Sequence, residues 1–361
     1  MGHPTIDNRT PWAFEALCTT DADGWPVLVP LIQATFTAGP NGLSPAEVQP
    51  PIDLAGSSHG DPGHSSLKRE PETAYWKPGT DVVLFGHAHA PGPRITEMEV
   101  SLRVGKLGVR ARVVGDRKWV KGLTDPTPSK PLPIEAVPLI YERAYGGLDQ
   151  RHADPKRHGE EPRNPVGRGY HAKGSAFEEG ELLPNLEHPD APVKSYWGKS
   201  TPVGFGFIAP HWSPRREWAG TYDKTWEEER FPRLPEDFSE DFFRAASPGL
   251  SSPTHLRGDE GVLAEGVVPE GRWAFDLPGL APPQVTVARK LGAPEILGTV
   301  LGSLILDADQ KTVTLVFRTR TRLATGMHDL SGLVIEPHGG AAPPPLPQNV
   351  KPMAPRARRR R

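Results

Sequence analysis

Proline and glycine interrupt this sequence so often that they exclude long helices. The 361 residues include 43 prolines and 38 glycines, without the three-residue period of collagen. Proline fixes φ and lacks an amide donor, whereas glycine permits positive φ. Only 36% of the residues are hydrophobic, yet a chain of this length can bury a large core without cross-links. The sequence therefore predicts short strands joined by ordered but irregular backbone.

Apolar residues that alternate with polar ones mark strands in the first part of the chain. Met98–Val104 and Leu107–Val113 follow a period of two, and the Gly105-Lys106 pair between them predicts a hairpin. Residues 38–80 are rich in Pro, Gly, Ser and Asp and are expected to form a long surface excursion. Further strands are predicted at 12–19, 25–36, 81–90 and 134–145.

Strand patterns return in the last third of the chain. Strands are predicted at 261–268, 272–277, 284–290, 296–306 and 312–322, with a hairpin turn at 307–310. In the last of these strands, Val313, Leu315 and Phe317 share one face. The other face carries Arg318, Arg320 and Arg322.

Residues 146–246 lose this periodicity but keep their aromatic side chains. Turn-forming pairs such as Asn164-Pro165 and Pro184-Asn185 crowd the segment. A disordered linker is poor in aromatic residues, so this block is expected to be ordered. Short helices are predicted at 222–230 and at 238–246, where Ser239 is a suitable N-cap.

Together these patterns predict a mainly β protein with strands from both ends of the chain in sandwich- or barrel-like antiparallel sheets. We expect a single domain over 1–330, in which strand-rich parts at 1–145 and 247–330 flank the irregular block 146–246. This block, with one or two short helices, is expected to lie across or between the sheets. Residues 331–361 are expected to form a Pro-rich, basic, disordered tail.

Charge and targeting features favour a soluble protein that binds neither nucleic acid nor membrane. The net charge is −2, and six cations at 341–361 leave −8 on the rest, which repels nucleic acid. The single cysteine, Cys18, excludes a disulfide framework and fits a reducing compartment. The start shows no secretory signal pattern, and the longest apolar run, 296–306, is too short to span a bilayer. We therefore expect a cytoplasmic protein.

Two patterns are candidates for catalysis. Residues 56–60 match the G-x-S-x-G form of a nucleophile elbow, but their Pro-, Gly- and Asp-rich flanks lack the strand and helix that this motif requires. His87 and His89 would share one face of a strand, as two metal ligands do, with His59 or His64 as a third. No Asp or Glu stands at ligand spacing near them, so imidazoles bonded to backbone are the favoured alternative.

Several long phrases of the sequence resemble the type VI secretion effector-adaptor family, which was long labelled only as a domain of unknown function. These phrases are DVVLFGHAHAP (81–91), VGDRKW (114–119), PLIYERAYGG (138–147), NPVGRGY (164–170), LPNLE (183–187), PVGFGFIAPHWSPR (202–215) and GTYDKTWEEERFPRLPEDFSEDFFRAA (220–246). The resemblance covers roughly residues 10–320. The stretch after Ala246 departs from the family's usual sequence, and the basic tail lies outside the resemblance.

The resemblance implies an adaptor or chaperone that holds a toxic effector and helps to load it onto the secretion spike. Such proteins are typically encoded beside PAAR-type spike-tip proteins, toxins and pentapeptide-repeat proteins. The implied partners are therefore a secreted effector, a PAAR-type spike-tip protein or both. The resemblance implies no catalysis and no cofactor.

Aromatic and arginine side chains of the block are the natural candidates for partner contact, because such residues dominate interface energetics. The candidates are Arg143, Tyr145, Arg168, Tyr170, Trp197, Trp212, Arg215, Trp218, Tyr222, Trp226 and Arg230. Each of them is alternatively a brace for its own loop. Two other functions remain open from the sequence: a metal-dependent hydrolase that uses His87 and His89, and a structural component of a phage-like injection apparatus.

Overall fold

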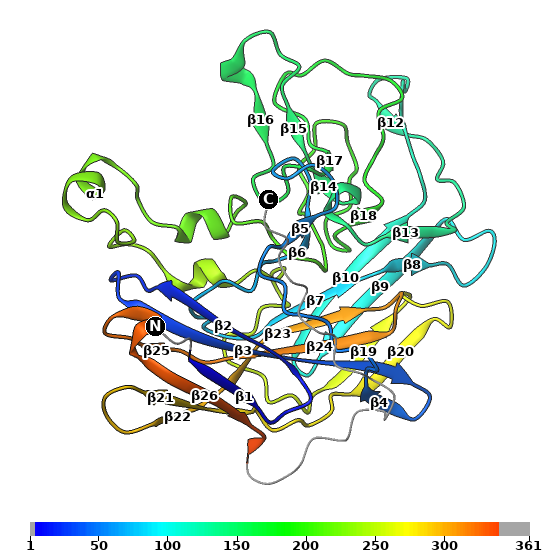
Figure 1. Cartoon of the computed structure of the whole chain (residues 1–361). Coiled ribbons are helices and arrows are strands. Elements are labelled where there is room, and N and C mark those ends of the chain that lie inside the picture. Colours follow the sequence, from blue (N-terminus) through cyan, green and yellow to red (C-terminus); the bar gives the residue numbers. More distant parts are fainter. Residues whose placement is uncertain (1–3, 339–361) are drawn as a thin grey trace, which may run out of the picture.

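The protein is described by a computed structural model over residues 4–338, and β-strands dominate it (Figure 1). Most of the longer strands belong to three sheets, and none of the sheets formed by residues 4–338 closes into a barrel. The prediction of a mainly β protein is confirmed. Within the same range, no helix is long and apolar enough to cross a membrane.

The first sheet joins the two ends of the chain. Its strands run in the order β2 (Ala13–Thr20), β3 (Pro26–Gly39), β24 (Thr312–Arg318), β23 (Val300–Asp307) and β7 (Asp81–Phe85). Two short strands, β4 (Gly42–Pro45) and β25 (Thr321–Arg322), also pair with β3. Strand β7 lies parallel to β23, and the other pairs are antiparallel. The sheet is therefore mixed rather than purely antiparallel.

The second sheet is built around the predicted hairpin. Its order is β18 (Leu186–Glu187), β10 (Leu107–Val114), β9 (Glu97–Val104), β19 (Gly261–Glu265) and β20 (Arg272–Asp276). Leu107 faces Val104 across the Gly105-Lys106 turn, which confirms the hairpin. Strand β18 covers only the far end of β10, at Arg112 and Val113.

The third sheet brings the described ends of the chain side by side. Its order is β1 (Thr5–Asn8), β26 (Leu330–Glu336), β21 (Gln284–Arg289) and β22 (Glu295–Gly298), and β1 runs parallel to β26. Strand β26 lies inside the segment expected to be a tail, so the predicted boundary at residue 330 is wrong. The rest of that expected tail, from 339, lies outside the described residues.

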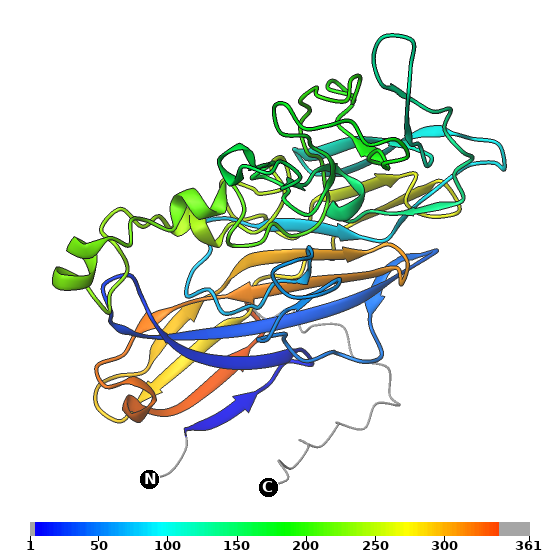
Figure 2. The same cartoon turned by 90° about the horizontal axis from the view of Figure 1, so that it is seen from above.

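One apolar core lies among the three sheets. It takes Leu28 and Ile32 from the first sheet, Val100 and Val104 from the second and Ile335 from the third, all with almost no exposed surface. Figure 2 shows the central block along one side of these strands. The block therefore has a continuous β scaffold beneath it.

The predicted strand at 296–306 is two strands in two different sheets. The chain leaves β22 at Gly298 and enters β23 at Val300. The corner is fixed by Thr299, whose hydroxyl donates to the Pro283 carbonyl oxygen at 2.7 Å. An apolar run alone does not reveal such a change of sheet, because both halves are equally suited to a strand.

The predicted strand at 134–145 is also interrupted. It contains β13 (Ala136–Pro138), a 3-10 turn at Tyr141–Arg143 and the start of β14 (Tyr145–Gly146). The helix predicted at 222–230 is present as α1 (Lys224–Glu229). The helix predicted at 238–246 is only a 3-10 turn, Glu240–Phe243, although Ser239 caps it as expected.

Residues 38–80 contribute to the interior as well as to the surface, which corrects the prediction of a surface excursion. Glu72, Tyr75 and Lys77 are buried. The guanidinium of Arg318 on β24 donates to the Glu72 carboxylate and to the Ala74 carbonyl oxygen. The arginine face of the last strand therefore draws this segment onto the first sheet.

The remaining elements are short and belong mostly to the irregular parts of the chain. They are β5 (Ser57–Ser58), β6 (Leu67–Arg69), β8 (His87–His89), β11 (Trp119–Val120), β12 (Thr127–Pro128), β15 (Leu148–Asp149), β16 (Gly159–Glu160), β17 (Arg168–Gly169) and 3-10 turns at Pro155–Arg157, Arg215–Trp218 and Gly326–Asp329. The expectation of an ordered but irregular block at 146–246 is confirmed.

Candidate protein-binding surface

Three of the sequence candidates are buried inside the block. Trp212 and Arg215 have 0% and 2% of their surface exposed, and Tyr145 has 1%. Arg215 donates to the carbonyl oxygens of Phe242 and Ile208 and to the Glu70 carboxylate, at 2.7–2.9 Å. These side chains hold the block together, because a buried guanidinium needs a full set of acceptors. The three side chains are therefore internal braces, and in this structure they offer almost no surface to a partner.

Aromatic side chains of the block join others from residues 119–145 in two small cores. Trp119, Tyr145 and Tyr196 gather in one core, where Trp119 and Tyr196 meet edge to face with ring centroids 5.3 Å apart. Tyr141 and Trp212 meet in the other in the same manner, at 5.4 Å. Such pairs stabilise beyond their buried area. They explain how a segment with little regular structure stays ordered.

Two of the sequence segments that carry the family resemblance, 138–147 and 164–170, lie in direct contact and are hydrogen-bonded to each other. The Asn164 side-chain amide donates to the carbonyl oxygens of Tyr141 and Tyr145, both at 2.9 Å. Gly146 has a φ of 152°, and a Cβ atom there would lie 2.1 Å from the Asn164 carbonyl oxygen. Only glycine tolerates both conditions. The close approach of the two segments therefore has a structural reason.

Arginines that remain near the surface of the block also serve as braces. Arg143 donates to the Asn185 side-chain oxygen at 3.2 Å and lies 3.7 Å from the Asp116 carboxylate. Arg230 donates from Nε to the Leu234 carbonyl oxygen at 2.9 Å. Arg168 has one buried nitrogen without a hydrogen-bond partner, and burial together with the charge of Arg143 lowers its pKa.

Tyr222 and Trp226 lie together in the segment of the block that carries α1. Residues 220–237, called the arm below, form a loop with α1 at its outer end. The arm extends to one side of the molecule in Figure 1, and its Leu234 amide donates to the Ala22 carbonyl oxygen in the turn after β2. The rings of Tyr222 and Trp226 meet edge to face with centroids 4.7 Å apart. Phe231 adds a third ring, 5.7 Å from Trp226.

This aromatic cluster is open to solvent. Tyr222 is 53% exposed and Phe231 is 68% exposed, and Trp226 is partly exposed. Three neighbouring large apolar side chains on a projecting loop are unusual, since exposed apolar surface that gathers in one place marks an interaction site. Phe231 was missed in the sequence, although its place five residues after Trp226 in the same polar segment is a usable signal.

Hydrogen bonds hold the arm in a defined shape. Asp223 caps α1 by accepting the Trp226 amide at 2.9 Å, and the Trp226 indole donates to the Arg233 carbonyl oxygen at 2.9 Å. At the base, the Asp237 carboxylate accepts both the amide and the hydroxyl of Thr221. These bonds lower the pKa of Asp237, so it stays ionised at neutral pH. The rings are therefore presented in one arrangement.

Trp197 and Tyr170 border a different hollow. Trp197 is 46% exposed, and its indole donates to the Ser175 carbonyl oxygen at 3.1 Å. The two aromatic residues line the hollow together with Lys173 and Lys199. Trp218 is half-buried in the 3-10 turn that leads to the arm. The sequence candidates are thus divided among the arm and the turn that leads to it, this hollow, the interior, and the half-buried positions of Arg143 and Arg168.

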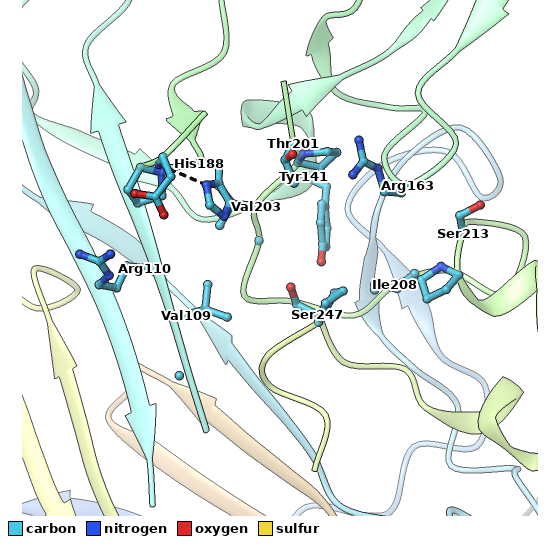
Figure 3. A pocket seen from close by; sticks show the side chains of 17 residues that line it. Val109, Arg110, Tyr141, Arg163, His188, Thr201, Val203, Ile208, Ser213 and Ser247 are labelled. Carbon is cyan, nitrogen blue, oxygen red and sulfur yellow. Dashed lines mark hydrogen bonds between the residues drawn. The ribbon is translucent and has the colours of Figure 1, made fainter. Parts of the chain in front are cut away.

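A separate cavity of about 430 Å³ lies between the block and β10 (Figure 3). Val109 and Arg110 line one side, and Tyr141, Val203 and Ser247 line the other. Burial raises the pKa of Tyr141 to about 12, although the nearby Ser247 hydroxyl acts in the opposite direction. The Tyr141 hydroxyl makes no hydrogen bond of good geometry with any described residue and is closed off from solvent. This closure leaves it out of reach of a ligand in the cavity.

The residues considered for catalysis, His87, His89 and Ser58, lie in surroundings that, within the described part of the chain, lack the features of a metal site or a nucleophile elbow. His87 Nδ1 is 2.8 Å from the Asp309 carboxylate at the surface, and the rings of His87 and His89 have centroids 6.4 Å apart. Across residues 4–338, no three His, Cys, Asp or Glu side chains are grouped so that they could hold a metal ion. Ser58 lies on β5, which pairs with β6 rather than leading into a helix.

Comparison with known proteins gives one match. A family model described as "Uncharacterized protein conserved in bacteria (DUF2169)" matches residues 23–318. No curated protein and no solved structure is significantly similar to the chain. The matched range contains the whole of the central block, the arm and most strands of the first two sheets.

Proposed function

We propose that this chain, which belongs to the DUF2169 family of uncharacterized bacterial proteins, is a non-catalytic adaptor. The adaptor binds a type VI secretion effector and helps to load it onto the spike, as the resemblance of its sequence phrases implies. It acts in the cytoplasm before secretion. Its partners are the effector, a PAAR-type spike-tip protein or both.

The observation that carries this proposal is the exposed aromatic cluster of the arm. Tyr222, Trp226 and Phe231 offer large apolar surfaces that lose little conformational freedom on binding. Their supports are already in place, because the arm is closed at its base by Asp237 and Thr221. A binding site that is organised beforehand spends less free energy on ordering when the partner arrives.

The division of the molecule also supports an adaptor. The three sheets share one core and supply a stable platform. The central block lies along one side of this platform, and the arm is part of the block. Binding residues are commonly carried by loops that a rigid scaffold positions. An interface on the order of 800 Å² per partner is expected for a stable complex.

The deciding experiment is co-purification of the full chain with the toxin and the spike-tip protein encoded beside it. Trp226→Ala with Phe231→Ala should weaken binding by about tenfold or more, since truncated hot-spot residues cost at least about 1.4 kcal/mol. Leu123→Ala with Leu291→Ala is the matched control, because both leucines are highly exposed and lie outside the arm.

Two results would overturn parts of this proposal. If the chain binds neither neighbour and secretion of the toxin is normal without it, the adaptor function is wrong. If it binds a neighbour but the arm variant binds as tightly as the control, the arm is not the binding surface.

A further inference from the structure

Carboxylates surround the aromatic cluster of the arm. Residues 220–237 contain six acidic side chains and three basic ones. The arm is therefore negative as a whole, and its exposed apolar centre lies within this negative field. The distribution of these charges decides which kind of partner the arm can accept.

Two of the acidic side chains are engaged inside the arm. Asp223 accepts the Trp226 amide at the start of α1, and Asp237 accepts from Thr221 at the base. These two residues shape the arm. They are not free to move towards a partner.

The three consecutive glutamates of α1 are the available charges. Glu227, Glu228 and Glu229 are all exposed. Glu228 lies 3.5 Å from the Lys224 ammonium, but both side chains are more than 60% exposed, so water screens this pair strongly. Glu227 and Glu229 form no salt bridge with any residue between 4 and 338.

The positive side chains of the arm neutralise this surface only in part. Arg230 is half-buried, and its Nε points to the Leu234 carbonyl oxygen. Lys224 is 85% exposed and lies on the same short helix as the glutamates. Arg233 is exposed and lines the same hollow as Glu229 and Arg230. Among the described residues none of these cations forms a salt bridge with Glu227 or Glu229, so a partner that approaches the aromatic cluster meets these two carboxylates unpaired.

We propose that the arm receives a basic protein segment that carries an apolar side chain at its centre. The apolar side chain packs on Tyr222, Trp226 and Phe231, and flanking lysines or arginines face Glu227 and Glu229. A hollow of about 420 Å³ beside Trp226, with Thr221, Arg230 and Pro235 in its wall, lies next to this contact. Complementary charge of this kind steers association and selects partners. The inference rests on the proposed adaptor function and names the chemistry of its partner.

The same charges exclude other classes of partner for this surface. Phosphate groups of nucleic acid and anionic lipid headgroups are repelled by three adjacent carboxylates. A neutral apolar partner would gain nothing from them. A basic protein segment is the occupant that uses both the rings and the acids.

The test compares two sets of charge reversals in the full chain. One variant carries Glu227→Lys, Glu228→Lys and Glu229→Lys on the arm. The control carries Glu47→Lys, Asp61→Lys and Glu135→Lys, which are exposed acids outside the arm and change the net charge by the same amount. Dissociation constants for the toxin or spike-tip protein that co-purifies are measured at about 50 mM and about 300 mM salt, where screening differs strongly.

The expected result is that the arm variant binds at least about tenfold more weakly than the control at low salt. Wild-type binding should also weaken as salt rises, whereas the arm variant should lose this dependence. If arm-dependent binding is unchanged by salt and by the arm reversals, the partner is not basic, and only the adaptor proposal survives. If no neighbour binds at all, both proposals fall.

Discussion

Arg318 shows how much one side chain can organise. It is fully buried on β24, and it joins the first sheet to the segment around Glu72. Gly302 makes room for it, because a Cβ atom there would lie 2.7 Å from the arginine Nε. The residue thus connects strands from the end of the chain to a loop from its first quarter.

Replacement of Arg318 by Met should lower the free energy of unfolding by about 3–5 kcal/mol, because Glu72 is left as an unpaired buried charge. The double change Arg318→Met with Glu72→Leu should recover part of this loss. Urea unfolding followed by tryptophan fluorescence gives the values. Arg322→Ala is the control and should change stability by no more than about 1 kcal/mol, since Arg322 is 55% exposed. An equally small effect at Arg318 would contradict its structural role.

Asp81 should make stability depend on pH below neutrality. Burial alone would raise its pKa, but the Lys77 ammonium at 2.8 Å and hydrogen bonds from Ala245 and Ser251 outweigh burial and lower it. A carboxylate with a depressed folded-state pKa stabilises above its unfolded pKa of about 3.9, and this contribution is lost as pH falls through the folded value.

Asp81→Asn should therefore be less stable than wild type at pH 7, by about 3 kcal/mol or more, because Lys77 is left buried without its partner. The difference should shrink as pH falls below about 4. Urea unfolding of both proteins between pH 3 and pH 7 measures this difference in the free energy of unfolding. A constant difference over this range would show that Asp81 is not the group that titrates.

Residue type alone does not separate the binding candidates. Trp212 and Trp226 belong to similar polar, aromatic phrases, yet one is buried against Tyr141 and the other is partly exposed on the arm. The difference comes from contacts with residues far away in the sequence. The sequence could name two of the three aromatic residues of the arm, Tyr222 and Trp226, but not which of the candidates face solvent.

At the scale of single elements, the arm should behave as a local unit. Asp237→Asn weakens the two bonds to Thr221 that close its base. Amide hydrogen exchange should become faster within 220–237, while the midpoint of thermal unfolding stays nearly unchanged, since Leu234 is the residue of the arm that packs against a core cluster among the described residues. Asp61→Asn, on another exposed loop, is the control. Unchanged exchange in the arm would mean that other contacts hold it.

Elements that follow from a local sequence pattern could be predicted. Elements that depend on contacts with distant segments of the same chain could not. The hairpin of β9 and β10 follows from strict alternation around a two-residue turn, so the hairpin itself was predicted correctly. The corner at Thr299 depends on a carbonyl oxygen from Pro283, which no pattern within 296–306 reveals. The burial of Glu72 and Lys77 likewise depends on acceptors and donors from other segments.

At the scale of the whole molecule, β1 protects an edge. Its four residues are exposed, and Ile6 is 54% exposed, so the strand adds little apolar burial. Its backbone covers β26, however. Removal of residues 1–9 should leave a folded protein that self-associates more strongly, because an uncovered strand edge pairs with other chains. Light scattering against concentration measures this, and Ile6→Thr, which keeps the strand, should stay as wild type. Equal behaviour of both variants would contradict the protective role.

The pairing of early strands with late ones also sets the order of events during synthesis. Strands β3, β7, β9 and β1 pair with β24, β23, β19 and β26, respectively. The first sheet therefore needs residues up to Arg322 and the third needs residues up to Glu336, whereas the second is complete at Asp276. The arm is synthesised before its scaffold is finished, and its base bonds to Ala22 through Leu234. A partner that needs the arm on a first sheet that contains β24 must therefore wait until translation has passed residue 318.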